Sequence, residues 1–271
     1  MKTVREGTAG KARLRLVQSA AGFTGVVIEG GKTTFQVSGP EADTVWTELQ
    51  DQLVRDEPNW FGYAGARARF LHWFDGGFNS PNYLGPQGER GYKLAAKQRL
   101  EAMTPVEEAA TGSGHGEAVL SAFRATNLLY PVEMTRLQGL LRGSDADAFV
   151  RAAARFALGE GKSALRAMET LLRPHDNAKW AVVTYLPFLW RPATHIFLKP
   201  EVTKDFAARV QHKLERSYSA ELDYGVYEDL LDLAGQIRAS MADLGPRDMI
   251  DIQSLLWVVG GYREGREAVR Q

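Results

Sequence analysis

The chain has 271 residues, with 33 acidic and 33 basic side chains and 44% hydrophobic residues, a composition typical of a soluble globular protein. The sequence contains no cysteine, which excludes disulfides, thiolate catalysis and cysteine-bound zinc or iron–sulfur clusters. The first residues lack the apolar segment of a signal peptide, and no apolar stretch approaches the roughly 20 residues that cross a bilayer. We therefore expect a cytoplasmic protein with no membrane association.

The N-terminal residues predict a small β-rich unit over residues 1–58. KARLRLV alternates cationic and apolar side chains, and FTGVVIEGGKTTFQV contains two β-rich runs around Gly30-Gly31, the signal of a hairpin. These patterns predict strands within 11–38. A helix follows from Pro40, with apolar residues at three-to-four spacing up to Leu53.

The remaining residues, 59–271, predict a mainly helical domain. An aromatic segment from Trp60 to Phe78 leads into a Pro- and Gly-rich loop at 79–88, and helical periodicity resumes at 89–103. Glycine and proline breaks divide 104–183 into several helices, and three more follow Pro200. The fold class is therefore α+β, a β-hairpin/ββα unit packed on a helical bundle.

One segment, TYLPFLWRPATHIFLKPEVT at 184–203, interrupts this pattern. Its X-Pro pairs predict an irregular Pro-rich insertion, because proline removes a helical hydrogen bond and disfavours a helical residue before it. Arg191, His195 and Lys199 stand among its aromatic residues. These side chains could donate hydrogen bonds to the backbone carbonyls of an irregular segment or to buried acids. They could equally bind a phosphate or a base. The structural interpretation is favoured, and both remain open.

Charge is distributed unevenly. Residues 61–100 hold six basic and two acidic residues, a net charge of +4, whereas residues 201–271 hold nine basic and thirteen acidic ones, a net charge of −4. The basic segment could face an anionic partner, or it could pair with the acidic C-terminal region of the same chain, which is the favoured interpretation. The nucleic-acid-binding candidates from both segments are Arg67, Arg69, Arg90, Lys93, Lys97, Arg191, His195 and Lys199.

Familiar catalytic motifs are missing. Gly159-Glu160-Gly161-Lys162-Ser163 lacks the earlier glycine of a phosphate-binding loop and follows a helix, so it predicts an inter-helix turn. The five histidines lack the spacing of a helical metal site, and we expect neither a metal nor a cofactor. Asp248 and Asp251 would share the first turn of a helix, where dipole stabilisation and pairing with Arg247 are the favoured explanation.

Three strings resemble an uncharacterised bacterial family: FDGGFNSPNYLGPQGERGYK at 74–93, LPFLWRPATHIFLKPEVT at 186–203 and LGPRDMIDIQSLLWVVGGY at 244–262. Together they cover less than half of the chain. Similar C-terminal segments occur in proteins connected with bacterial restriction or other DNA-directed defence. The family supplies no catalytic residue to carry over, and Leu255 replaces a family phenylalanine by another apolar side chain.

Three hypotheses about function follow. The first is a nucleic-acid-associated, non-enzymatic module that uses the β-rich unit and the basic residues above to bind DNA or RNA. The second is a protein-interaction subunit that docks a protein partner through aromatic surface around Trp60–Phe78. The third is a hydrolase or nuclease whose site would require His195, Lys199, Asp248 and Asp251 to converge. The sequence leaves open whether any reaction is catalysed.

Overall fold

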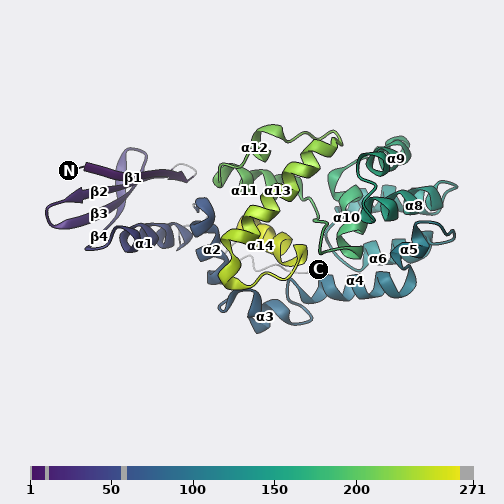
Figure 1. Ribbon diagram of the computed structural model, residues 1–271, viewed down its shortest axis with the longest axis horizontal. Helices are drawn as coiled ribbons and strands as arrows, with labels where there is room; N and C mark the ends of the chain where they lie inside the picture. Colours follow the sequence, from purple (N-terminus) through teal and green to yellow (C-terminus); the bar gives the residue numbers. More distant parts are fainter. Residues whose placement is uncertain (1, 10–11, 56–59, 263–271) are drawn as a thin grey trace.

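A computed structural model describes residues 2–9, 12–55 and 60–262. The chain folds as an antiparallel sheet with one helix, followed by a larger helical body (Figure 1), which confirms the α+β class. The strands are β1 (Lys2–Ala9), β2 (Ala12–Ser19), β3 (Gly22–Glu29) and β4 (Lys32–Gly39), hydrogen-bonded in sequence order. The sequence pattern predicts strands only from residue 11 on, so β1 was not anticipated.

The turn between β3 and β4 lies where the glycine pair predicts it. Gly30 and Gly31 have φ values of 54° and 79°, and Glu29 pairs with Lys32 across the turn. A two-residue turn with positive φ at both positions matches the twist of the flanking strands, and glycine adopts it without steric cost.

One face of the sheet forms a small core of its own. Leu14, Leu16 and Val27 pack against Val45 and Leu49 of α1 (Ala42–Arg55). Because successive side chains of a strand point to opposite faces, the residues between these core positions lie on the other face of the sheet. A T-shaped contact between Trp46 and Phe61, with ring centroids 6.3 Å apart, lies where this unit meets the helical body.

The helical body has a larger core. Its longer helices are α2 (Gly62–Trp73), α4 (Gly91–Met103), α6 (Gly116–Arg124), α7 (Pro131–Leu141), α8 (Ala146–Ala157), α9 (Lys162–Leu172), α10 (Trp180–Trp190), α11 (Pro200–Arg209), α13 (Tyr224–Ser240) and α14 (Met249–Gly261). The short ones are α3 (Pro81–Leu84), α5 (Val106–Ala109), α12 (Leu214–Ser217) and the 3₁₀ turns η1 (Gly77–Asn79), η2 (Arg173–His175) and η3 (Ala242–Leu244). The Gly159–Ser163 segment forms the predicted turn and the start of α9.

The prediction of an irregular insertion at 184–203 was wrong for its first half. Residues 184–190 continue α10 with Pro187 inside it, and only 191–199 are irregular. All eleven residues of α10 are buried. An interior proline costs about 3 kcal/mol, whereas burying each large apolar side chain contributes about 1.5–3 kcal/mol, so packing of Phe188, Leu189 and Trp190 outweighs the lost hydrogen bond.

The aromatic segment after residue 59 is also interior rather than surface. Trp60, Phe70, Phe74 and Phe78 are all buried in the main core. These four side chains therefore do not form the exposed aromatic patch that the protein-interaction hypothesis requires. The last helix starts at Met249, with Asp248 as its N-cap.

Candidate functional site

The basic segment pairs with the C-terminal region of the same chain, the favoured interpretation of its charge. Arg67 forms an ion pair with Asp243 at the surface. Arg69 is 1% exposed and donates to the carbonyl oxygens of Val259 and Tyr262 at 2.8 and 2.7 Å, where α14 ends. Arg69 therefore stabilises the C-terminal end of a helix.

Arg90 joins this pairing at the start of α14. Its guanidinium binds both carboxylate oxygens of Asp248 at 2.8 Å and Oδ1 of Asp251 at 2.8 Å. Asp251 also accepts from Tyr83 Oη at 2.6 Å. Burial, followed by the charge of Asp251, raises the pKa of Tyr83 well above its ordinary value, so this hydroxyl acts as a donor. Asp251 thus lies in the first turn of α14 and contacts Arg247, as predicted, whereas Asp248 is the N-cap and accepts from the backbone N–H of Ile250.

A second buried pair lies at the start of α4, between Lys93 and Glu89, which precedes the helix. Lys93 Nζ donates to Glu89 Oε2 and to Ser254 Oγ, both at 2.8 Å, and Tyr262 Oη donates to Glu89 Oε1 at 2.7 Å. Lys93 is 0% and Glu89 2% exposed. The strings at 74–93 and 244–262 are therefore joined by interior ionic contacts. Lys97 pairs with Glu101 on the same helix, close to the surface.

The three candidates of the irregular segment have separate partners. Arg191 pairs with Glu107, and His195 Nδ1 is 2.9 Å from Tyr227 Oη. Burial lowers the pKa of His195 to about 4, against a smaller opposing effect of a backbone contact with Ala157, so the ring is neutral at pH 7. Lys199 Nζ donates to the carbonyl oxygen of Leu128 at 2.8 Å.

These contacts bear on the hydrolase hypothesis. His195 bonds to α13, Lys199 to the carbonyl before α7, and Asp248 and Asp251 to Arg90. The four side chains therefore occupy three environments, and their contacts do not assemble a common site. Among the described residues, no group of three or more His, Asp or Glu side chains is placed to hold a metal ion.

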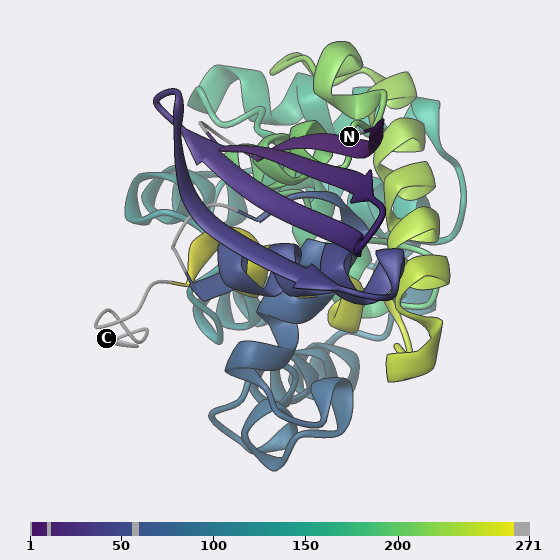
Figure 2. The same cartoon turned by 90° about the vertical axis from the view of Figure 1, so that its left-hand side faces the viewer.

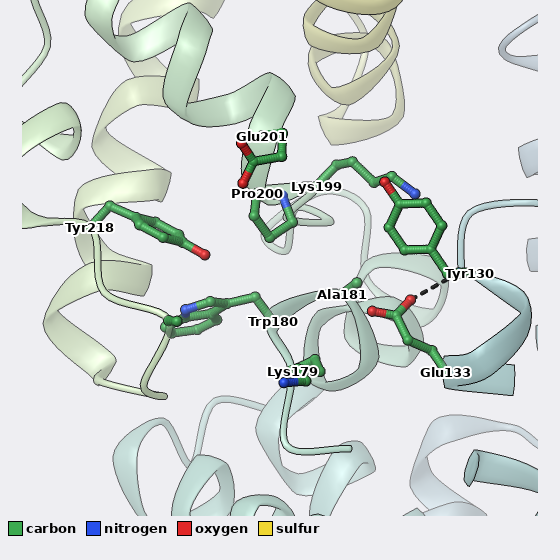
Figure 3. Close-up of a pocket in the computed structure, with 10 residues that line it drawn as sticks. Tyr130, Glu133, Lys179, Trp180, Ala181, Lys199, Pro200, Glu201 and Tyr218 are labelled. Carbon is green, nitrogen blue, oxygen red and sulfur yellow. Dashed lines mark hydrogen bonds between the residues drawn. The ribbon is translucent and has the colours of Figure 1, made fainter. Parts of the chain in front are cut away.

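A pocket does lie beside Lys199 (Figure 3). It has a volume of about 170 Å³ and is lined by residues from four places in the chain: Tyr130, Glu133, Lys179, Trp180, Ala181, Lys199, Pro200, Glu201, Tyr218 and Ala220. Burial lowers the pKa of Lys199, partly offset by the charge of Glu133. Apart from Lys199, sequence reasoning did not identify these residues, because they share no motif or periodicity.

The second surface feature is the outer face of the sheet. Register places Arg13, Arg15, Val17, Val26 and Ile28 on it, opposite the core with α1. Arg13 is exposed, and Arg15 Nε contacts Glu6 Oε1 at 2.7 Å. Figure 2 looks onto the sheet from this end, and none of the described helices crosses in front of it.

The described residues contain no helix with the length and hydrophobicity needed to cross a membrane. Comparison with known proteins finds no matching family model, no matching curated protein and no matching solved structure.

Proposed function

We propose that the protein is a non-enzymatic, nucleic-acid-associated module of a bacterial DNA-directed defence or DNA-processing system, and that the outer face of its N-terminal sheet contacts phosphates. The observation that carries the proposal is this open, arginine-bearing face. Exposed Arg13 and half-buried Arg15 stand there among hydroxyl and amide side chains, including Thr24, Gln36 and Ser38. Such side chains and arginines make most protein contacts to phosphate and sugar.

The strands and the helix of the N-terminal unit carry opposite net charges, which favours binding of an anion on the sheet. Residues 1–39 hold six basic and two acidic residues, a net charge of +4, whereas residues 41–57 hold one basic and six acidic ones, a net charge of −5. Glu41, Asp43 and Glu48 are exposed at or on α1, which packs on the other face of the sheet. An anionic partner is therefore attracted to the sheet and repelled from the helix.

The side chains also indicate how a nucleic acid would be read. Phe23 and Phe35, the two aromatic residues of the strands, pack against the core with α1 and not on the outer face. Without aromatic platforms, base stacking contributes little, and backbone contacts dominate. We expect binding with little sequence preference and a steep dependence on salt, since each neutralised phosphate releases counterions.

Fluorescence anisotropy with labelled single- and double-stranded DNA and RNA, at several salt concentrations, tests the proposal. Arg13→Ala should weaken binding to every sequence and reduce the slope of log affinity against log salt by roughly 1, the contribution of one phosphate contact. Arg216→Ala, an exposed arginine on α12, is the matched control and should leave the slope unchanged.

Two results would contradict the proposal: no binding at low salt, or an equal effect of both substitutions. In the first case the half-buried Val17, Val26 and Ile28 on the same face favour the second function, a protein-interaction subunit. An open sheet face with an apolar centre and a polar border is a common docking surface.

A further inference from the structure

The pocket beside Lys199 has room for one small planar ring system. Its volume is about 170 Å³. For comparison, an engineered apolar cavity of about 150 Å³ in another protein binds benzene. The lining is mainly apolar and comes from the start of α7, the start of α10, the start of α11 and the loop after α12. A lipid chain would exceed this space, whereas one planar ring system fits it.

Aromatic side chains form the walls, and two polar groups are directed into the hollow. Figure 3 shows the hydroxyl of Tyr218 pointing toward the space between Trp180 and Pro200, and one carboxylate oxygen of Glu133 directed toward Ala181 in the lining. Trp180 is 2% exposed, and its indole N–H donates to the carbonyl oxygen of Ser219 at 2.8 Å, so the ring is held in place. One oxygen of Glu133 accepts from the backbone N–H of Tyr130 at 2.9 Å. An ionised carboxylate has about four acceptor sites, so Glu133 can still accept two N–H donors from a ligand.

The charges around the pocket disfavour an organic cation. Lys199 Nζ already lies 4.0 Å from the centre of the Tyr130 ring, and Lys204 Nζ lies 5.2 Å from that of Tyr218. Lys204 also pairs with Glu201 at 2.8 Å. Lys199 thus covers one face of Tyr130, and Lys204 covers one face of Tyr218 and neutralises Glu201, so the chain's own cations already fill the positions that an organic cation would take.

A small inorganic anion fits no better. The ammonium of Lys199 is bonded to a backbone carbonyl, and most of the lining is carbon. What remains compatible is an uncharged ring that stacks on aromatic surface and carries N–H donors on its edge. Carboxylates accept hydrogen bonds from such edges, as glutamate does from the amino group of cytosine.

We propose that this pocket binds an uncharged planar heterocycle of the nucleobase class, as a free base or nucleoside, with Glu133 accepting from its edge, Tyr218 against one face and the apolar lining around the rest of the ring. Guanosine carries two adjacent N–H donors on one edge, whereas uridine carries one. We therefore expect guanosine to bind more tightly than uridine. This site is separate from the sheet face and does not depend on the proposed nucleic-acid contacts.

The test is isothermal titration calorimetry of the full chain with guanosine and uridine, with choline and inorganic phosphate as ligands of the other two classes. Ala220→Trp fills the pocket from its exposed rim, and Ala208→Trp places the same side chain at an exposed position on α11 outside the pocket. Ala220→Trp should abolish nucleoside binding, Ala208→Trp should preserve it, and Glu133→Gln should weaken guanosine binding about tenfold.

Several outcomes would overturn this assignment: no saturable binding of either nucleoside, equal effects of the two tryptophan substitutions, or binding of choline or phosphate in place of nucleosides. The same variants separate this site from the sheet. Ala220→Trp should leave the anisotropy of labelled DNA unchanged, so that failure of one proposal does not entail failure of the other.

Discussion

Replacing Lys93 by methionine tests whether the buried ion pair of α4 holds the helical body together. The substitution keeps the volume and removes the ammonium that donates to Glu89 and Ser254. Glu89, 2% exposed, would then keep a buried charge without the ammonium of Lys93. Breaking a buried pair by removing one partner costs about 3–5 kcal/mol, because the remaining charge is desolvated and uncompensated. We expect Lys93→Met to lower the free energy of unfolding by that amount.

The same helix supplies the control. Lys97 and Glu101 form an i, i+4 pair as Lys93 and Glu89 do, but their side chains are 20% and 39% exposed. Lys97→Met should therefore cost less than about 0.5 kcal/mol. Urea denaturation followed by circular dichroism measures both, and Lys93→Met with Glu89→Gln should recover much of the loss. Equal costs for Lys93→Met and Lys97→Met would refute the reasoning from burial.

Two further predictions concern a buried histidine and the hairpin turn. Burial lowers the pKa of His195 to about 4, below an unfolded value of about 6.5, so the unfolded chain binds the extra proton between these pH values. The free energy of unfolding should therefore fall by about 3 kcal/mol as pH drops from 6.5 to 4. Urea denaturation at each pH measures this fall, and the His195→Gln variant should not show it. Gly31→Val should lower the free energy of unfolding of the N-terminal unit by roughly 1–3 kcal/mol, seen as a lower midpoint of thermal unfolding, because a β-branched residue is strained at φ 79°; an unchanged midpoint would show that the turn relaxes.

Local patterns in the sequence predicted much of the fold. Strands β2 to β4 follow from alternation and from the glycine pair between β3 and β4, which are short-range signals. Strand β1 carries no such alternation, since KTVREGTA has only Val4 and Ala9 as apolar residues. It is a strand because it pairs with β2 along its whole length, and that pairing is tertiary information.

Pro187 shows the opposite limitation. Proline removes a hydrogen bond within the helix, so the local sequence predicts a helix break at Pro187. That prediction was wrong because contacts with residues far away in the sequence stabilise the helix. Tyr185 is packed with its ring 4.3 Å from that of Phe123, and its hydroxyl donates to the carbonyl oxygen of Ala122. Thr184 Oγ1 accepts from the backbone N–H of Leu198, which ties the irregular segment to the helix. Neither contact can be read from periodicity.

The candidate sites were harder to predict because formal charge in a sequence does not distinguish exposed from buried groups. The net charge of +4 over residues 61–100 indicates a basic surface, but Arg69, Arg90 and Lys93 supply much of it from the interior. Arg90 pairs with Asp248 and Asp251 of the acidic C-terminal region, whereas Arg69 and Lys93 contact α14 through uncharged groups. A polyanion is attracted by exposed charge, because buried charged groups already have their partners within the chain. By that criterion Arg13, which sequence reasoning did not select, is a better probe of nucleic-acid binding than Arg90, because its loss leaves the core intact.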